Sequence, residues 1–223
     1  MTATLPQQVQ NVFARFATAT LTTVEAGGRP AIASVEARYS PGDPCIDVSA
    51  RAADPKVALL FCEPAGSGLE GAPQVLVQGT AQAGEGDLLR VRPERVYVWP
   101  EGDPAREPEL FDAHIEEVRS GHVEEPAAEL PPAEGGSAAW GSWVEELGKG
   151  DGTAVLSLVA PDGFPFSVRL PIDVDAERRC IRLVAGVLGV PVHPGLACLG
   201  AGKGLRLSGD LVEDERGWAV IPH

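Results

Sequence analysis

The sequence has few cysteines, few aromatic residues and no long apolar run. Its cysteines are too far apart for the C-x-x-C spacing of zinc and redox sites; they are Cys45, Cys62, Cys180 and Cys198. No window approaches the roughly 18 apolar residues of a membrane-spanning helix. Residues 1–10 also lack the basic and then apolar pattern of a secretory signal. We therefore predict a cytoplasmic protein with reduced thiols, and neither a disulfide-stapled domain nor a membrane protein.

Basic residues are scarce as well. The chain has 18 Lys and Arg against 32 Asp and Glu, which gives a net charge of −14. Such an acidic balance excludes nucleic acid and anionic membranes as expected partners. Between Glu101 and Glu134 there are eleven acids and two bases. The acidic excess is thus concentrated in the middle, and a cationic pocket for a small molecule remains compatible with the two flanking parts.

Motifs of several enzyme classes are missing. The sequence contains no Gly-x-Ser-x-Gly elbow, no P-loop and no dinucleotide-binding glycine pattern. No two histidines are four residues apart, and no histidines and cysteines cluster locally, so we predict no structural metal site. The acidic pairs in the middle of the chain are most simply a solvated face. The residues alone therefore name no catalytic group.

A stretch of 33 residues occurs twice. Residues 18–50 match residues 153–185 at a shift of 135 positions without a gap. The identical pairs are Thr18/Thr153, Ala19/Ala154, Leu21/Leu156, Val24/Val159, Gly28/Gly163, Pro30/Pro165, Cys45/Cys180, Ile46/Ile181 and Ala50/Ala185. Each copy has a β-branched run, a turn with glycine, a second run and a short third run. This pattern predicts strands joined by hairpins.

The repeat continues on both sides of this stretch. Residues 54–61 match residues 193–200, with Pro55 aligned to Pro194 and Leu60 to Leu199, and residues 75–80 match 205–210. An apolar helical stripe precedes each copy and predicts helices over residues 5–17 and 137–148. We therefore predict a mainly β protein with flanking helices (α+β). Its first domain covers residues 1–100, an acidic helical linker residues 101–136, and a second, diverged domain residues 137–223.

The linker and its border contain two further predicted elements. Residues 96–99 predict a short aromatic strand. Residues 108–119 place apolar side chains at helical spacing and predict an amphipathic helix; the stripe consists of Leu110, Phe111, His114, Ile115 and Val118. Residues 126–136 are rich in proline and glycine, and we expect the hinge of the linker there.

Several motifs of the first copy resemble those of one known family. They are Ala19-Thr-Leu-Thr-Thr-Val, Gly28-Arg-Pro, Asp54-Pro-Lys-Val-Ala-Leu-Leu-Phe, Val75-Leu-Val-Gln-Gly-Thr-Ala and Arg92-Pro-Glu-Arg-Val-Tyr-Val-Trp. In this order they resemble the pyridoxamine 5′-phosphate oxidase-like family of FMN-binding split barrels, including its deazaflavin-using relatives. The resemblance implies two tandem split β-barrels that form an intrachain pseudo-dimer with two unequal interfacial clefts. Whether this pair forms a further homodimer is left open.

The resemblance also implies cofactor-binding residues. The family usually has a long basic turn after its third strand, whereas here residues 49–54 cross that gap with Arg51 as a cation and Lys56 just beyond. The second copy has no basic residue in 185–194. We therefore expect a phosphate-bearing cofactor on the first copy. Its expected contacts are Ser34, Ser49, Arg51 and Lys56 for the phosphate, and Gln78 and Thr80 for the ring or ribityl chain. Each also fits an ordinary strand position or a solvated charge.

Three functions remain open at this point. The first is a flavin (FMN) or deazaflavin (F420) oxidoreductase that transfers hydride or electrons to a small molecule, with the cofactor supplying the chemistry. The second is a haem-binding split barrel with a histidine as axial ligand, for which His114 and His193 are the candidates. Both histidines also fit a plain packing or turn position. The third is a non-catalytic ligand-binding scaffold that has lost the cofactor. The sequence does not name the substrate.

Overall fold

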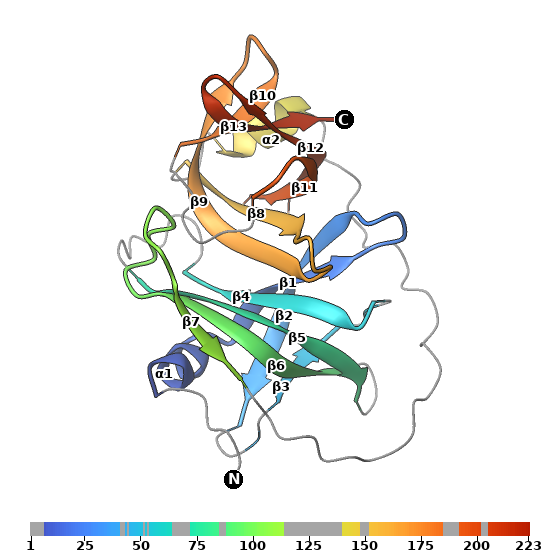
Figure 1. Cartoon of the computed structure of the whole chain (residues 1–223), viewed down its shortest axis with the longest axis vertical. Helices are drawn as coiled ribbons and strands as arrows, with labels where there is room; N and C mark the ends of the chain where they lie inside the picture. The colour runs from blue at the N-terminus through green and yellow to red at the C-terminus, as the bar shows by residue number, and fades with distance from the viewer. Residues whose placement is uncertain are drawn as a thin grey trace.

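The computed structural model describes residues 7–40, 43, 45–50, 52, 54–63, 72–84, 88–113, 140–147, 152–184, 192–201 and 205–223 of the chain. These residues contain thirteen strands and two helices, and twelve of the strands form two six-stranded β-barrels. The first barrel lies below the second in Figure 1, and their strands meet in the middle of the molecule. No helix in this described part is long and apolar enough to cross a membrane.

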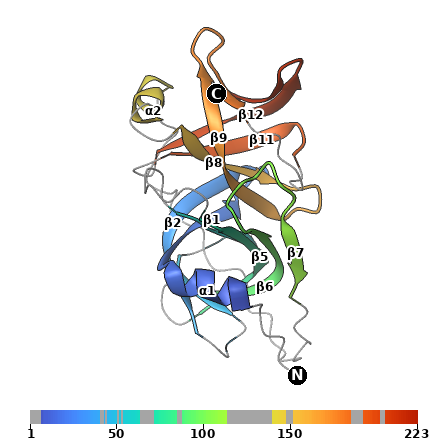
Figure 2. The same ribbon diagram turned by 90° about the vertical axis from the view of Figure 1, so that its left-hand side faces the viewer.

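The first barrel closes in the cyclic order β1–β2–β3–β6–β5–β4, because β3 pairs with β6 as well as with β2. Its strands are β1 (Thr18–Val24), β2 (Pro30–Tyr39), β3 (Ile46–Ser49), β4 (Lys56–Phe61), β5 (Gln74–Ala83) and β6 (Leu88–Trp99), and β7 (Glu109–Asp112) extends the sheet beyond β6. Helix α1 (Gln7–Arg15) lies across the lower part of this barrel (Figure 2). Its apolar stripe, including Val9 and Phe13, is buried in the first core.

The second barrel repeats this plan strand for strand. Its strands are β8 (Thr153–Val159), β9 (Pro165–Asp175), β10 (Cys180–Leu183), β11 (Gly195–Gly200), β12 (Arg206–Asp214) and β13 (Gly217–Pro222). They close in the order β8–β9–β10–β13–β12–β11, so β8 takes the place of β1 and β13 that of β6. Helix α2 (Trp140–Leu147) buries Trp143 in the second core. The predicted mainly β fold with two tandem split barrels is confirmed.

The first hairpin of each barrel turns in the same way. Gly28 has a φ of +78° and Gly163 a φ of +82°, a left-handed conformation that glycine adopts without steric cost. Each glycine N–H donates to the carbonyl three residues earlier, Glu25 in one copy and Ala160 in the other. The turn glycines of the two copies are therefore structural equivalents, at the predicted shift of 135 positions.

The predicted alignment of the fourth strands is wrong by one residue. In β1, Leu21 pairs with Leu59, and in β8 the equivalent Leu156 pairs with Leu199. The structural equivalent of Leu199 is thus Leu59 and not Leu60. Successive side chains of a strand point to opposite faces, so a slip of one residue exchanges core and interface positions. Accordingly, Leu59 lies in the core of its own barrel, whereas Leu60 packs into the core of the other.

The barrels are joined through an apolar interface. Leu60, Leu76 and Trp99 belong to strands of the first barrel but pack within the hydrophobic core of the second, and all are at most 1% exposed. Trp99 contacts the ring of Phe166 of β9 edge-on, at a centroid distance of 6.3 Å. Burying each such side chain contributes roughly 1.5–3 kcal/mol to stability. The interface between the barrels is therefore part of what stabilises the folded chain.

An approximate two-fold axis relates the barrels. Thr22 and Ser157 are equivalents, 135 positions apart, and their hydroxyl oxygens lie 3.2 Å from each other. A residue that contacts its own equivalent lies at the symmetry axis of a pair. In agreement, β9 packs on β1 and β4, and its equivalent β2 packs on β8 and β11. The two barrels thus form the predicted intrachain pseudo-dimer.

The helix predicted over residues 108–119 is wrong at its start. Glu109–Asp112 form β7, which pairs antiparallel with residues 95–98 of β6. Phe111 packs against the first core while Leu110 is 54% exposed, an alternation typical of a strand. The long β6 offers an open edge, and pairing with it overrides the helical period of so short a segment. Residues 114–119 lie outside the described residues.

Other predicted elements differ mainly in length. The strand predicted over residues 96–99 begins at Leu88, because residues 88–91 close the barrel against β3. Within it, Pro93 lies opposite Gly79, where the register shifts at a β-bulge. The helices predicted over residues 5–17 and 137–148 correspond to α1 and α2.

Candidate functional site

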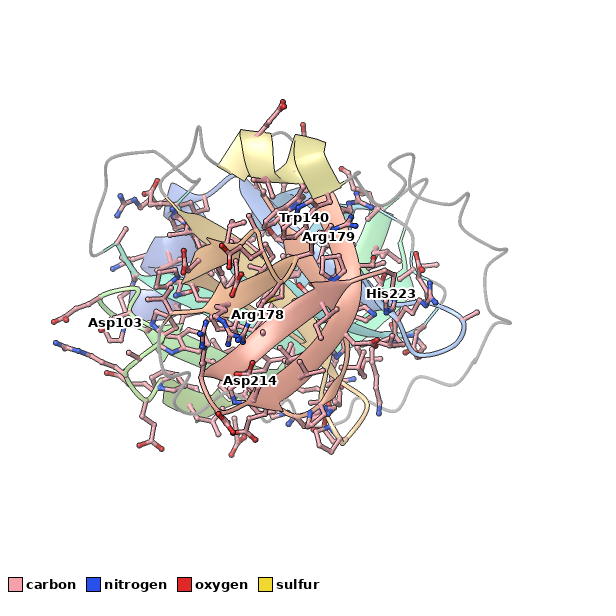
Figure 3. The ribbon with its side chains drawn as sticks, turned by 90° about the horizontal axis from the view of Figure 1, so that it is seen from above. Asp103, Trp140, Arg178, Arg179, Asp214 and His223 are labelled. Carbon is pink, nitrogen blue, oxygen red and sulfur yellow. The ribbon has the colours of Figure 1, made fainter. Side chains whose placement is uncertain are left out.

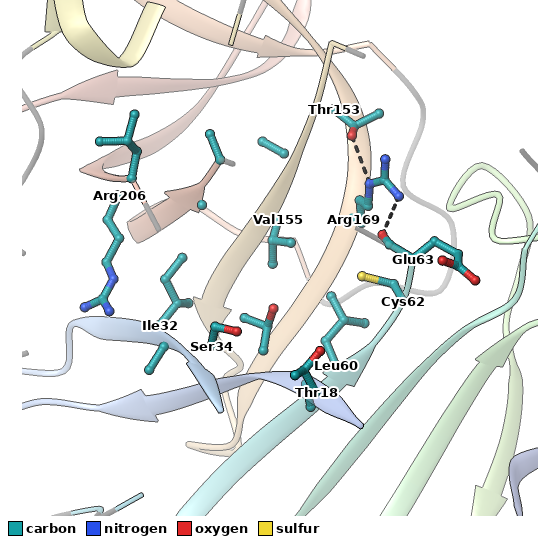
Figure 4. A pocket seen from close by; sticks show the side chains of 17 residues that line it. Thr18, Ile32, Ser34, Leu60, Cys62, Glu63, Thr153, Val155, Arg169 and Arg206 are labelled. Atoms are coloured by element: carbon teal, nitrogen blue, oxygen red, sulfur yellow. Dashed lines mark hydrogen bonds between the residues drawn. The ribbon is translucent and has the colours of Figure 1, made fainter. Parts of the chain in front are cut away.

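A cleft of about 250 Å³ lies where the two barrels meet (Figure 4). The first barrel contributes β1, β2 and the end of β4, and the second contributes β8, β9, β11 and the start of β12. Its lining includes five pairs of equivalent residues: Thr18/Thr153, Ala19/Ala154, Thr20/Val155, Ser34/Arg169 and Leu60/Gly200. A cleft lined by equivalents from both copies lies on the pseudo-two-fold axis, and we call it the axial cleft.

The two walls of the axial cleft differ in charge. The first barrel presents the hydroxyls of Thr18, Thr20 and Ser34, whereas the second barrel presents Arg169 and Arg206. Figure 4 shows these two arginines at opposite ends of the cleft, with Ile32, Ser34 and Val155 between them. The wall of the second barrel thus carries two cations, while the wall of the first carries hydroxyls and Glu63, whose carboxylate pairs with Arg15 at 2.5 Å. Because that carboxylate has its own partner, the wall with the two arginines is an environment for an anion.

Arg169 is held firmly at its end of the axial cleft. Its Nε donates to Thr153 Oγ1 at 2.9 Å, and one terminal nitrogen donates to the carbonyl oxygen of Glu63 at 2.6 Å. The side chain of Gln74, which is buried, bonds both the backbone N–H and the carbonyl of Arg169, at 3.0 and 3.1 Å. These contacts from both barrels fix the guanidinium before any ligand arrives, which lowers the entropic cost of binding.

Arg206 is held less tightly. It is the first residue of β12, is half-buried, and forms no hydrogen bond or ion pair with any residue that the structure describes. The described residues therefore leave its charge available to a ligand. A bound anion would supply a counter-ion.

Cys62 lies beside Arg169 in the axial cleft. Burial raises the pKa of its thiol to about 11, against a smaller lowering effect of Arg169 and a further increase from Glu63. The group is therefore a neutral thiol near pH 7. Since the thiolate is the nucleophilic form, Cys62 has the character of a packing residue here and not of a catalytic nucleophile.

The described members of the predicted cofactor set do not all come together: Lys56 lies opposite Thr80 in the β4–β5 pair, and Gln78 is on the same strand as Thr80, but Ser34 lies elsewhere. Ser34 lines the axial cleft. Ser49 is exposed at the end of β3, and Thr80 bonds the carboxylate of Glu94. Lys56 and Gln78 lie under the hairpin that joins β8 and β9, as described below, and Arg51 is outside the described residues. The assignment of these six residues to a cofactor stays a prediction.

The β8–β9 hairpin of the second barrel occupies the surface around Lys56. The ammonium group of Lys56 donates to the carbonyl of Asp162 at 2.8 Å and lies 4.8 Å from the ring centre of Phe164. Arg95 stacks on the same ring at 4.6 Å and pairs with the Asp162 carboxylate at 2.6 Å. Gln78 donates to the carbonyl of Pro165 at 2.8 Å. We call this set of contacts the hairpin lock.

The hairpin lock affects the ionisation of Asp162. Partial burial alone would raise the pKa of this carboxyl. Hydrogen bonds from Arg95 and from the backbone N–H of Phe164, with the nearby charges of Arg95 and Lys56, outweigh that effect and lower the pKa below its ordinary value. Asp162 is therefore ionised at neutral pH and attached to the first barrel.

Of the two histidines proposed for haem, one can be located. Both ring nitrogens of His193 face backbone carbonyls, Nε2 that of Val159 at 2.8 Å and Nδ1 that of Pro194 at 3.0 Å. A nitrogen engaged in this way is not presented to an iron atom. His114 lies outside the described residues. In the described part of the chain, no three His, Cys, Asp or Glu side chains group as metal ligands.

A second group of charges lies on the outer side of the second barrel. Figure 3 shows Arg178 and Asp214 together, on the side of the barrel away from Trp140 of α2. Asp214 pairs with Arg182 at 2.8 Å, and the hydrogen bonds from Arg182 and the backbone of Arg216 lower its pKa to about 2. These cations already have carboxylate partners. Arg206 of the axial cleft forms no ion pair with a described residue, so we regard the axial cleft as the better anion site.

Sequence reasoning missed Arg169, Arg206 and Arg95. A signal for Arg169 was present, because the ungapped repeat aligns it with Ser34, a residue already proposed to contact a ligand. Neither Arg206 nor Arg95 has such a signal. Their roles depend on how the second barrel docks on the first, which no local pattern encodes.

The fold and its axial cleft define a tandem split-barrel protein. No protein-family model matches the chain, and no curated protein does. Similar solved structures include a haem-binding protein from Mycobacterium smegmatis, at 18% identity and a TM-score of 0.39, over 48% of this chain and 57% of that one. Another is a protein of Clostridium acetobutylicum related to general stress protein 26 of the pyridoxinephosphate oxidase family, at 11% identity and a TM-score of 0.37, over 48% of this chain and 92% of that one.

Proposed function

We propose that the protein binds a small anionic molecule in the axial cleft. The observation that carries this proposal is the placement of Arg169 and Arg206 on one wall of a cleft, in a chain with a net charge of −14. Cationic side chains in a recessed site focus the local potential and attract anions even when the whole molecule is acidic. The hydroxyls of the opposite wall supply neutral hydrogen-bond partners for the same ligand.

The predicted oxidoreductase activity needs FMN or F420, which would supply hydride or electron transfer when bound. The described residues do not fit this use of the first copy's surface, because the hairpin lock engages Lys56 and Gln78. The volume of the axial cleft is also below the roughly 300–1,000 Å³ of typical ligand pockets. We therefore derive no step through a flavin, and favour the ligand-binding alternative over the flavin and haem alternatives.

The test begins with the absorption spectrum of freshly purified protein. The spectrum shows whether the protein carries a flavin, a deazaflavin, haem or no such cofactor. The protein is then titrated with FMN, F420, haem, inorganic phosphate and simple carboxylates by calorimetry. We expect at least one anion to bind, and Arg206→Gln to weaken it by about ten- to a hundredfold, since a charged hydrogen bond contributes roughly 1.5–3 kcal/mol. Arg38→Gln, which changes an exposed arginine of β2, is the matched control.

Two results would contradict the proposal. In the first, no anion binds to the folded wild-type protein. In the second, an anion binds, but with the same affinity to the wild type and to the Arg206→Gln and Arg169→Gln variants. A flavin or Soret band that survives purification would instead support the corresponding alternative.

A further inference from the structure

We infer that the ligand of the axial cleft is a small amphiphile, with one anionic head at Arg206 and a hydrocarbon body that extends toward Val155 and Leu60. A short-chain carboxylate has this chemistry. The inference rests on the proposed anion binding and adds the class of the ligand and its direction in the cleft. It follows from the order of the side chains along the cleft (Figure 4).

The wall of the second barrel contains one row of cross-strand neighbours. Arg206 of β12 pairs with Gly200 of β11, and Gly200 pairs with Val155 of β8. Val155 in turn pairs with Arg169 of β9, and all four residues line the axial cleft. Neighbouring strands lie about 4.8 Å apart, so the backbones of the two arginines are roughly 14 Å apart along the row. Between them the row is uncharged.

The Arg206 end of this row receives the head of the ligand. Arg206 forms no ion pair with a residue that the structure describes. A planar carboxylate accepts two hydrogen bonds from one guanidinium. Ser34 of β2, on the wall of the first barrel, offers a hydroxyl as a further donor. An anionic head at this end therefore meets a cation that no described carboxylate neutralises.

The Arg169 end of the row does not require a second anionic group. The guanidinium of Arg169 already donates to Thr153 and to the carbonyl oxygen of Glu63, at 2.9 and 2.6 Å. The carboxylate of Glu63, which pairs with Arg15, also places a negative charge at this end. A second anionic group would compete with these hydrogen bonds and approach that carboxylate. A ligand with one charged end and one uncharged end fits both ends of the cleft.

The centre of the axial cleft suits a hydrocarbon body. Val155 and Leu60 line it from the two walls. Ile32 lies beside the row because Gly200 makes room for it, since a Cβ at Gly200 would lie 2.5 Å from Ile32 Cδ1. Cys62 is a neutral thiol near pH 7, because burial raises its pKa to about 11, and a neutral thiol packs as a small apolar group. The body of the ligand therefore meets apolar groups on both walls.

The volume of the axial cleft limits the length of this body. At roughly 30 Å³ for each group of the size of a water molecule, a cleft of about 250 Å³ holds about eight non-hydrogen atoms. Hexanoate has this size. A carboxylate of similar size is therefore the best probe of the inference.

The experiment titrates the full-length protein by calorimetry with acetate, butyrate, hexanoate, adipate and 1-hexanol. We expect the affinity to rise about two- to fourfold with each methylene group from acetate to hexanoate, because each methylene is buried in the cleft. Hexanoate should bind at least about tenfold more tightly than 1-hexanol, which has the same body without the charge. It should also bind more tightly than adipate, which adds a second carboxylate.

Two variants test the position of the ligand. Arg206→Gln should weaken the binding of hexanoate by about ten- to a hundredfold, because the head loses its cation. Val155→Thr keeps the shape of the side chain and places a hydroxyl beside the body, so it should weaken hexanoate by at least about threefold. Val184→Thr is the matched control, because it makes the same change at an exposed position that does not line the cleft. Thermal melts check that each variant is folded.

The outcomes separate this inference from the proposed function. Anions that bind without a gain from acetate to hexanoate would overturn the inference and leave the proposed anion binding intact. Tighter binding of adipate or inorganic phosphate than of hexanoate would do the same, because the site would then prefer more than one negative charge.

The variants give further outcomes of this kind. Hexanoate binding that is unchanged in folded Arg206→Gln but weakened in Arg169→Gln would overturn the inference, because the head would lie at the other end. Equal binding to Val155→Thr and Val184→Thr would also overturn it, because the body would not contact Val155. Absence of binding by every anion tested, including phosphate and FMN, would overturn the proposed function itself.

Discussion

The hydroxyl of Thr22 lies 2.5 Å from that of Ser167, which takes the place of Ile32 in the second barrel. Ser157 completes the group, 2.8 Å from Ser167 and 3.2 Å from Thr22. All three side chains are fully buried at the pseudo-two-fold axis. The two barrels are thus joined at the axis by hydroxyls that have only one another as described side-chain partners.

Replacing Thr22 by valine keeps the shape of the side chain and removes its hydroxyl. We expect a loss of about 1 kcal/mol in the free energy of unfolding, because Ser157 and Ser167 lose a buried partner. Denaturant unfolding monitored by tryptophan fluorescence measures it. The triple variant Thr22→Val, Ser157→Ala, Ser167→Ala should recover part of this loss, since no hydroxyl is then left without a partner. A triple variant that loses three times as much would contradict the shared network.

The hairpin lock predicts a dependence of stability on pH. The folded-state pKa of Asp162 lies below its ordinary value of 3.8. The contribution of ionised Asp162 to the stability of the folded state is therefore complete above pH 3.8. It is lost as the pH falls through the folded-state pKa. Asp162 and its partner Arg95 are both partly exposed. We therefore expect Asp162→Asn to lower the free energy of unfolding by no more than about 1 kcal/mol at neutral pH. The cost should vanish at the acid end of a series of thermal melts.

The control for this prediction is Asp173→Asn, which changes an exposed aspartate of β9 with no ion pair in the described part of the chain. We expect it to leave stability unchanged across the same series. If the difference between wild type and Asp162→Asn stayed constant down to the lowest pH, the lowered pKa of Asp162 would be wrong.

The strand assignment of β7 predicts different roles for two adjacent residues. Phe111 packs against the first core, so Phe111→Ala should lower the free energy of unfolding by roughly 1–2 kcal/mol. Leu110 is exposed on the other face, and Leu110→Ala should change it by less than about 0.5 kcal/mol. Both would be destabilising if the segment formed the amphipathic helix that its sequence predicts.

Gly79 should resist substitution. A Cβ at this position would lie 2.2 Å from the carbonyl oxygen of Arg92, which belongs to the backbone of the neighbouring strand and has little room to move. We expect Gly79→Ala to destabilise the protein by about 1–3 kcal/mol. Gly141→Ala in α2 is the matched control, because a Cβ there meets nothing within 4 Å and alanine favours a helix. Chemical denaturation of both variants would show whether Gly79 is the more sensitive position.

The fold was largely predictable because the sequence contains the same strand pattern twice. The gapless match of residues 18–50 with 153–185 carries the strand pattern, and the turn glycines Gly28 and Gly163 mark the same hairpin in each copy. The predicted alignment of strands was less accurate where the two copies differ in length. The slip between β4 and β11 is set by pairing with β1 and β8, and a shared proline such as Pro55/Pro194 does not report that register.

The candidate site was less predictable, for a physical reason. Arg169 and Arg206 acquire their roles from the docking of one barrel on the other, and that docking buries side chains spread over many strands. The phosphate role of Lys56 stays a prediction, and the structure adds a contact of its ammonium group with the β8–β9 hairpin. Its charge was visible in the sequence, but its partner was not.

The covalent link between the barrels has a consequence for the axial cleft. In a dimer of identical chains, a residue near the two-fold axis appears on both walls, so an arginine at the position of Ser34 would face a second arginine. Here the two positions mutate independently, and one wall holds Ser34 while the other holds Arg169. The axial cleft can therefore favour one orientation of an asymmetric ligand over the reverse orientation. Because the pairing is intramolecular, dilution does not separate the two walls.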